Sequence, residues 1–211
     1  MTVAFSHPAS EAFARQGYAI VRGLLASARV ELLRQHLERR AALGTMSQKD
    51  DQVPQTPAVY GDGEVDRLMQ DLVPALEAQT GLKLFLTYSY ARIYKRGDAL
   101  APHRDRSACE ISISVNLGQV PDAPWALHVG DDGFAALLAP GDVLIYRGCE
   151  LTHWREPYDG DSVVQAFLHY VDQNGPHAGE KFDGRPSLGN AFQPEVTGRL
   201  RPFTLLPLVP R

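Results

Sequence analysis

The sequence has few cysteines, no excess of basic residues and no long apolar run. Its 211 residues include only two cysteines, Cys109 and Cys149, and these do not form a CxxC pair. Two such residues exclude a disulfide framework, and we interpret both as reduced, largely buried thiols. The 21 Lys and Arg against 25 Asp and Glu give a net charge of −4, which disfavours broad nucleic-acid binding.

The sequence also lacks membrane and export signals. No stretch approaches the roughly 20 apolar residues of a spanning helix, and the opening MTVAFSHPASEAF has no basic segment followed by an apolar run. We therefore expect a cytoplasmic protein with no membrane or nucleic-acid partner. The hydrophobic share of 44% and charged share of 22% are typical of a soluble globular chain.

The first 82 residues are predicted to be mostly helical. Leucines and valine at helical spacing predict a helix over residues 26–43, and further helices are expected over 10–16 and 65–79. Pro74 is expected to kink or split the last of these. A short strand over 18–22 and a polar loop over 45–63 complete this part.

Residues 83–171 read as strands. Short apolar stretches separated by turn signals such as PGD predict strands over residues 84–94, 109–117, 125–129, 135–138, 142–146 and 162–171. In 109–117, apolar residues alternate with polar ones, and the alternation does not decide whether the polar face points inward or to water. Strands of this number and length favour a sandwich or jelly-roll barrel. Residues 172–211 are predicted to be an irregular extension of a single domain spanning residues 1–211.

Two segments carry a candidate metal site. In PHRDR, His103 and Asp105 are two residues apart, and residues at that spacing on a strand share a face. In PGDVLIYRGCELTHW, we expect a strand after the PGD turn to run toward His153. Two histidines and one carboxylate leave coordination positions open, as iron(II) needs when it binds a co-substrate and O₂ together.

These segments resemble the iron(II)/2-oxoglutarate oxygenases of the prolyl-hydroxylase and phytanoyl-hydroxylase type. The resemblance runs from about residue 13 to residue 170 and rests on FARQGYAIVRGLL, IYKRGDALAPHRDR and GDVLIYRGCELTHW. It implies a mainly β fold, a double-stranded β-helix (jelly-roll, cupin-like) barrel with the N-terminal helices packed on it. It also implies that His103, Asp105 and His153 are the catalytic metal ligands.

The resemblance implies an activity as well. Such enzymes use Fe(II), O₂ and 2-oxoglutarate, release succinate and CO₂, and oxidise a C–H bond of the substrate. Related halogenases carry a small residue where this chain has Asp105, so hydroxylation, or another oxidation such as desaturation, is favoured over halogenation.

One feature departs from the family pattern. The family usually holds the distal carboxylate of 2-oxoglutarate with an Arg or Lys on the strand after the distal His, but here SVVQAFLHYV has neither, and the usual position falls near Val163. Arg155 is our first candidate for the cation, because a guanidinium can donate two parallel hydrogen bonds to a carboxylate. Gln165 and His169 are candidates for added hydrogen bonds. Further candidates are Arg92 for the cation and Tyr94 for a hydrogen bond to the co-substrate; for Arg155 the competing interpretation is a surface salt bridge with Glu156 or Asp159.

Other functions stay open at this point. A cupin-like dioxygenase or isomerase that does not use 2-oxoglutarate would account for the missing arginine, and a non-catalytic binding module would keep only the barrel. The short chain, without a large insertion, favours a small-molecule substrate, either anionic or amino-acid-like. Arg106 could orient Glu110 or a substrate carboxylate, although a solvated rim is its simpler interpretation. The sequence specifies neither the substrate nor the oligomeric state.

Overall fold

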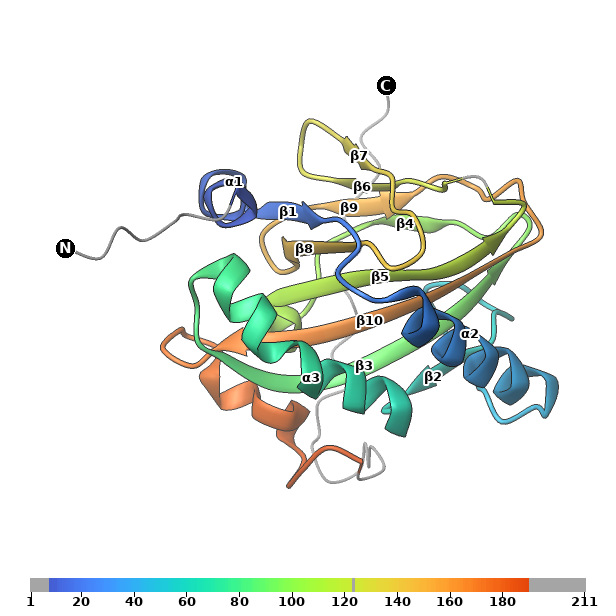
Figure 1. Ribbon diagram of the computed structural model, residues 1–211, viewed down its shortest axis with the longest axis horizontal. Coiled ribbons are helices and arrows are strands. Elements are labelled where there is room, and N and C mark those ends of the chain that lie inside the picture. The colour runs from blue at the N-terminus through green and yellow to red at the C-terminus, as the bar shows by residue number, and fades with distance from the viewer. Residues whose placement is uncertain (1–7, 123, 190–211) are drawn as a thin grey trace.

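The computed structural model describes residues 8–122 and 124–189. Two antiparallel sheets dominate it (Figure 1). The large sheet has the order β1-β8-β5-β10-β3-β2 and the small sheet the order β4-β9-β6-β7. The strands of the large sheet are β1 (Tyr18–Val21), β2 (Ala58–Tyr60), β3 (Leu84–Lys95), β5 (Ile111–Val120), β8 (Val143–Arg147) and β10 (Ser162–Asp172). Those of the small sheet are β4 (Leu100–His103), β6 (Leu127–Val129), β7 (Phe134–Ala136) and β9 (His153–Arg155).

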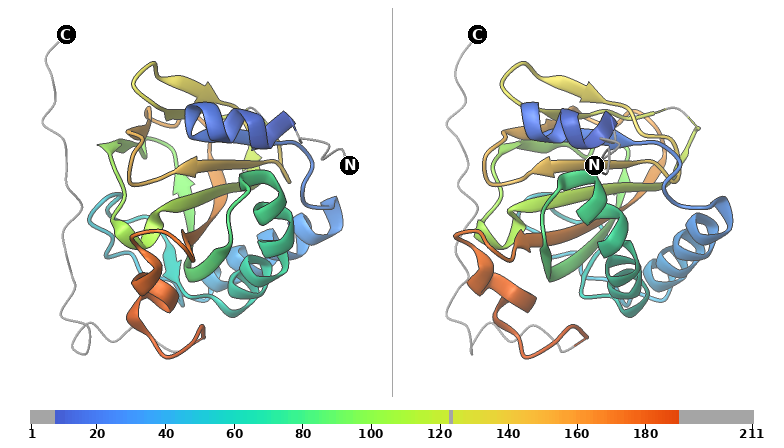
Figure 2. Two further views of the ribbon diagram at one scale, coloured as in Figure 1. Left: turned by 90° about the vertical axis from the view of Figure 1, so that its left-hand side faces the viewer. Right: turned by 60° about the vertical axis from the view of Figure 1, so that its left-hand side comes forward.

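Three helices and two 3₁₀ turns accompany the sheets. They are α1 (Pro8–Gln16), α2 (Ser27–Ala42), α3 (Gly63–Thr80), η1 (Ser107–Cys109) and η2 (Ala178–Gly184). Figure 2 shows α2 and α3 on the same outer side of the large sheet. Within the described residues the two sheets face each other without closing into a barrel. The predicted helices and strands are therefore present, but the predicted barrel is a two-sheet sandwich.

Helix α3 begins and ends at residues that the sequence marks clearly. Asp62 is the N-cap, and its carboxylate accepts from the backbone N–H groups of Glu64 and Val65. Gly81 ends the helix in the left-handed conformation, with φ of 73°. Pro74 lies inside a single helix, so the expected split does not occur.

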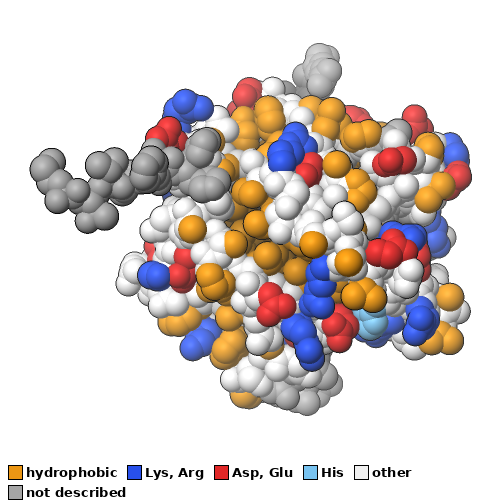
Figure 3. Space-filling view, viewed as in Figure 1, with side chains coloured by type: hydrophobic (Ala, Val, Ile, Leu, Met, Phe, Trp, Pro, Cys, Tyr) orange, Lys and Arg blue, Asp and Glu red, His pale blue; other side chains and the backbone are white. Residues whose placement is uncertain are grey.

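The main core lies between the helices and the large sheet. The apolar residues of β5 (Ile111, Ile113, Val115 and Leu117) are at most 1% exposed and pack in one cluster with residues of α2 and α3. On the face in Figure 3, apolar side chains gather over the middle of this sheet, with charged side chains around them. The polar face of β5 is also buried, because Ser112, Ser114 and Asn116 point between the two sheets.

Several predicted boundaries need correction. We expected a loop over 45–63, but Ala58–Tyr60 within it is a strand. It forms because its backbone pairs with β3, and a pairing with a distant strand cannot be predicted from so short a segment. Cys109 belongs to η1 rather than to β5. In the predicted irregular extension, residues up to 189 include the turn η2, whereas residues 190–211 lie outside the described part. The division into segments 1–82, 83–171 and 172–211 of one domain stays a prediction.

No helix in residues 8–122 and 124–189 combines the length and apolarity that a bilayer crossing requires.

Candidate metal centre and cavity

Two neighbouring strands of the small sheet bring the predicted triad together. His103 is the last residue of β4, His153 is the first of β9, and the two are direct partners in the antiparallel pair. Asp105 lies beyond the end of β4, where its backbone N–H donates to the carbonyl of Gly148 at 2.9 Å. The expectation that His103 and Asp105 share a strand is therefore wrong, as is the expectation that His153 ends the strand after the PGD turn. The three side chains nevertheless converge.

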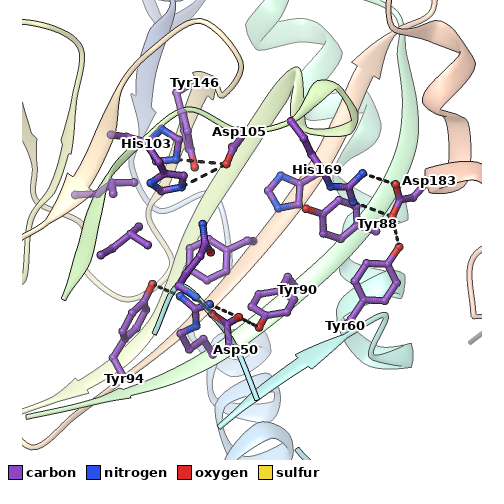
Figure 4. Close-up of a pocket in the computed structure, with 17 residues that line it drawn as sticks. Asp50, Tyr60, Tyr88, Tyr90, Tyr94, His103, Asp105, Tyr146, His169 and Asp183 are labelled. Carbon is purple, nitrogen blue, oxygen red and sulfur yellow. Dashed lines mark hydrogen bonds and ion pairs between the residues drawn. The ribbon is translucent and has the colours of Figure 1, made fainter. Parts of the chain in front are cut away.

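The geometry of the triad suits a metal ion. The Nε2 atoms of His103 and His153 each lie 3.6 Å from Oδ1 of Asp105. The two imidazole centroids are 4.3 Å apart, and both histidines are at most 3% exposed. Figure 4 shows the ligand atoms facing one another at one end of a cavity.

Each histidine is held in the tautomer that a metal requires. Nδ1 of His103 lies 2.9 Å from the carbonyl of Ala101, and Nδ1 of His153 lies 3.0 Å from the carbonyl of Leu151. A carbonyl can only accept, so Nδ1 carries the proton and Nε2 presents its lone pair to the shared point.

A hydrogen bond from Ser112 of β5 orients the carboxylate of Asp105. Its Oδ2 accepts a hydrogen bond of 2.8 Å from the Ser112 hydroxyl, which leaves Oδ1 for the ion. Gly148 makes room for this arrangement, because a Cβ there would lie 2.4 Å from Oδ2 of Asp105. Burial alone would raise the pKa of the Asp105 carboxyl, but the imidazoles of His153 and His103 hold it well below its usual range. Asp105 is therefore an anion ready to bind a cation.

A second cluster shares Asp105 with the triad. Cys109 and His169 also offer atoms within 4.8 Å of it and of each other. However, burial raises the pKa of the Cys109 thiol well above its usual value, and the thiol is 3.0 Å from the Tyr88 hydroxyl. A neutral thiol is a poor metal ligand. Burial also lowers the pKa of His169 to about 4, so this residue is a neutral neighbour of the triad.

The triad opens into a cavity of about 230 Å³. Aromatic side chains form much of its wall, among them Tyr60, Tyr88, Tyr90, Tyr94, Tyr146 and Phe167. Charged side chains line it in two places away from the triad: Asp50 with Arg92, and Asp183 with Arg106. In Figure 4, Tyr94 and Asp183 lie on opposite sides of this cavity.

Arg155 is buried rather than part of a surface salt bridge. Its side chain is 2% exposed, and its Nη1 donates to the carbonyl of Trp125 at 2.8 Å. Its Nε is buried without a partner, and no carboxylate among the described residues pairs with the guanidinium. The interpretation of Arg155 as paired with Glu156 or Asp159 is therefore wrong. The guanidinium lies over the Trp125 ring, 4.6 Å from its centre, so aromatic rings rather than a carboxylate face this buried cation, an arrangement that suits an anionic ligand.

The other candidates for the co-substrate gather around Tyr94. The Cζ atoms of Arg92 and Arg155 lie 5.2 and 6.0 Å from the centre of the Tyr94 ring. Arg92 donates to the Tyr94 hydroxyl at 3.2 Å and forms an ion pair with Asp50 at 2.5 Å. Both Arg92 and Tyr94 line the cavity, whereas Arg155 does not.

The two candidates on β10 lie apart from each other. Gln165 is 2% exposed and accepts from Ser114 at 3.3 Å, but it does not line the cavity. His169 lies beside Tyr88 on the Asp183 side (Figure 4) and lines the cavity. Val163, at the family's usual arginine position, packs with Tyr94 in an apolar cluster.

Two charged cavity residues escaped the sequence-based prediction. Asp50 comes from the segment predicted as a polar loop, and Asp183 from the segment predicted as an irregular extension. Asp183 accepts from both Nη atoms of Arg106, at 2.5 and 2.8 Å, and from the Tyr60 hydroxyl at 2.6 Å. No local pattern marks a single acidic residue in a loop as part of a site.

Comparison by sequence finds no matching protein family and no matching curated protein. Comparison by structure finds many similar folds. A prolyl-4-hydroxylase from Pseudomonas putida has a TM-score of 0.63 at 16% identity, covering 78% of this chain and 97% of its own. The 2-oxoglutarate-dependent carbocyclase SnoK from nogalamycin biosynthesis has a TM-score of 0.67 at 15% identity, covering 80% and 84%.

A third similar structure was determined with ligands. HygX from Streptomyces hygroscopicus, bound to nickel, 2-oxoglutarate and hygromycin B, has a TM-score of 0.61 at 18% identity. The alignment covers 78% of this chain and 86% of that protein. At such identities the likeness concerns the fold, and it confirms the double-stranded β-helix predicted from the sequence.

Proposed function

We propose that this chain, which has the fold shared by 2-oxoglutarate-dependent oxygenases, epimerases and carbocyclases, is itself an Fe(II)/2-oxoglutarate-dependent oxygenase. The observation that carries the proposal is the pairing of an open two-histidine, one-carboxylate site with an uncompensated buried arginine in the same interior. The two-histidine, one-carboxylate site suits iron(II). The buried arginine suits the second carboxylate of a dicarboxylate whose other end is at the metal.

The donor set fits iron better than structural zinc. His103, Asp105 and His153 supply three ligands, and a structural zinc site would be closed by four, usually with thiolates. The nearby thiol of Cys109 is kept neutral by burial. Three protein ligands leave the remaining positions for a chelating co-substrate and O₂.

Charge neutrality supports 2-oxoglutarate as that co-substrate. Arg92 and Arg155 both lie near Tyr94, and among the described residues only Asp50 forms an ion pair with either of them, so one positive charge remains at this end. One carboxylate of 2-oxoglutarate would balance it through Arg155 and Tyr94, and Gln165 would assist from β10. The other carboxylate, together with Asp105, would balance the divalent metal.

The residues of the chain would divide the work. When bound, the metal and co-substrate supply the oxidising chemistry, in which 2-oxoglutarate is converted to succinate and CO₂. His103, Asp105 and His153 hold the metal, Ser112 orients Asp105, and the surrounding tyrosines exclude water. Because Asp105 occupies the position that is small in halogenases, we propose hydroxylation of a small-molecule C–H bond as the reaction.

The first test is spectroscopic. Anaerobic protein with Fe(II) and 2-oxoglutarate should show a weak visible charge-transfer band, and O₂ should then yield succinate. Arg155→Ala should raise the dissociation constant of 2-oxoglutarate about tenfold or more, since the buried positive charge that would balance the distal carboxylate is lost. Arg34→Ala, which removes an ion-paired arginine on α2, is the matched control.

The outcomes separate the alternatives. A band that survives in Arg155→Ala and is lost in Arg92→Ala would assign the co-substrate to Arg92. Metal binding with neither band nor succinate would favour a cupin-like dioxygenase or isomerase that does not use 2-oxoglutarate.

A further inference from the structure

The cavity has a second arm that the metal and co-substrate leave free. If the co-substrate reaches from the triad toward Tyr94, the residues on the other side are Tyr60, Tyr88, Arg106, His169 and Asp183. We call this group the Asp183 arm; Figure 4 shows it across the cavity from Tyr94. This arm is the part of the cavity left beside the metal for a substrate, whose chemistry should match the polar groups of the arm.

Asp183 is placed in the arm at a conformational cost. Both Phe182 and Asp183 adopt positive φ, at 55° and 57°; this conformation is unfavourable for a bulky residue such as Phe182, and aspartate tolerates it better. Arg185 fixes the turn by donating to the carbonyls of Phe182 and Thr87, at 2.8 and 2.9 Å. Specific contacts therefore hold a strained turn beside the cavity. Such a turn favours a functional role for Asp183, the residue whose side chain it directs into the cavity.

Asp183 and Arg106 retain hydrogen-bonding capacity. Asp183 accepts from two nitrogens of Arg106 and from Tyr60, whereas a carboxylate can accept about four such bonds. Arg106 uses two N–H groups on Asp183, of the roughly five that a guanidinium carries. The Arg106 side chain keeps 27% exposure and lies over the Tyr88 ring at 4.7 Å. The arm therefore offers an acceptor and several donors side by side.

Charge and size restrict what the arm can bind. The pair of Arg106 and Asp183 is neutral as a unit, and the Asp183 side chain is buried, so a substrate of one net charge would leave one charge beside the pair without a partner. A zwitterion preserves neutrality, with its carboxylate at Arg106 and its ammonium at Asp183. A cavity of about 230 Å³, shared with the co-substrate, is small beside the roughly 300–1000 Å³ of ordinary ligand pockets.

Aromatic side chains line the cavity beside the pair. The ring of Tyr88 lies under Arg106, and Tyr90 and Phe167 also line the cavity; these rings suit an aliphatic or ring-shaped body. From these observations we propose that the substrate is a small free amino acid with an apolar side chain. Arg106 binds its carboxylate and Asp183 binds its ammonium group. This inference rests on the proposed oxygenase function, because that function assigns the other arm to 2-oxoglutarate.

Calorimetric titration tests the inference without turnover. The protein is loaded with Ni(II) and 2-oxoglutarate and titrated with leucine, isoleucine, valine, proline and phenylalanine. Each amino acid is compared with its N-acetyl derivative, which lacks the ammonium group, and with its methyl ester, which lacks the carboxylate. At least one free amino acid should bind about tenfold or more tightly than both derivatives, as expected when a buried charged partner is lost.

Two variants assign the preference to its residues. Asp183→Asn should reduce the preference for the free amino acid over its N-acetyl derivative to less than about threefold. Arg106→Gln should do the same for the preference over the methyl ester. Asp161→Asn, which removes an exposed aspartate paired with Arg96 at 2.7 Å, is the matched control and should keep both preferences. Comparison of two ligands within one variant removes the effect of any partial loss of folding.

Several results would overturn the inference. It fails if no free amino acid binds below about 10 mM, if derivatives bind as well as the parent, or if Asp183→Asn keeps the full preference. Tighter binding of an N-acetyl amino acid amide than of the free amino acid would point to a peptide substrate instead. If 2-oxoglutarate itself does not bind, the proposed function fails, and titration of the Ni(II)-loaded protein alone then decides whether the Asp183 arm binds amino acids.

Discussion

At the scale of single residues, both histidines of the triad use the same local device. Each donates from Nδ1 to the carbonyl two residues earlier in the chain, Ala101 for His103 and Leu151 for His153. The bond needs no partner from elsewhere in the fold, so the chain segment just before each histidine also fixes its tautomer. Asp105 differs, because its orientation depends on Ser112 from another strand.

Gly148, beside the triad, leaves no space for a larger side chain. A Cβ at this position would lie within 2.4–2.6 Å of Asp105 Oδ2, the Cys109 carbonyl and Ser112 Oγ. We expect Gly148→Ala to displace Asp105 and to weaken Fe(II) or Mn(II) binding about tenfold or more, measured by competition with a chelator. Gly179→Ala is the control, since a Cβ there meets nothing within 4 Å. Metal affinity of Gly148→Ala within about twofold of wild type would contradict the expectation.

Cys149 gives a prediction with a pH dependence. Burial raises the pKa of its thiol to about 12, so only a small fraction is thiolate at neutral pH. In metal-free protein, alkylation of Cys149 by iodoacetamide should be far slower than that of a free cysteine. Its rate should rise about tenfold per pH unit between pH 7 and 10. Mass spectrometry of the intact protein follows the reaction, and a rate that levels off near pH 9 would show an ordinary thiol.

At the scale of elements, Asp62 links the two helices that cover the large sheet. It caps α3 and also accepts from Arg40 of α2 at 2.6 Å, with His36 Nε2 2.9 Å away. Its carboxyl is 2% exposed. Burial alone would raise its pKa, but His36 and Arg40 lower it below the usual value.

Removal of this carboxylate should therefore destabilise the fold. We expect Asp62→Ala to lower the free energy of unfolding by about 1–3 kcal/mol, from the lost cap and the unpaired arginine. Because the folded-state pKa of Asp62 is depressed, its contribution is present above about pH 4 and is lost as the pH falls further. Urea unfolding at pH 7 and pH 3.5 measures both effects.

The matched control for this experiment is Asp71→Ala, an exposed aspartate on the same helix. It should change the stability by less than about 0.5 kcal/mol. If Asp62→Ala loses as much stability at pH 3.5 as at pH 7, the carboxylate is not the source of the effect.

At the scale of the whole molecule, the two sheets decide which polar residues face the site. The sequence of β5 gives two faces, and both are buried because the large sheet packs against helices on one side and faces the small sheet on the other. The polar side of β5 then supplies Ser112 to Asp105 and Ser114 to Gln165. A polar layer between sheets is what a charged co-substrate and metal require.

The sequence alone singled out the three residues of the triad, which the structure brings together, and predicted most of the elements. His103, Asp105 and His153 are recognisable from neighbouring residues, and the helices and strands follow from periodicity, caps and turn signals, all of which are local. Even the absence of an arginine on β10 is visible in the sequence.

Only the tertiary structure decided what surrounds the triad. The contact between Arg106 and Asp183 spans 77 residues, and that between Asp50 and Arg92 spans 42. Arg155 was the first candidate for the co-substrate cation, with a surface salt bridge as the competing interpretation, and only the structure shows that it is buried with no carboxylate partner among the described residues. Such ion pairs depend on how the sheets and loops pack. Local sequence patterns do not indicate which charged residue from a distant part of the chain will lie beside a given side chain.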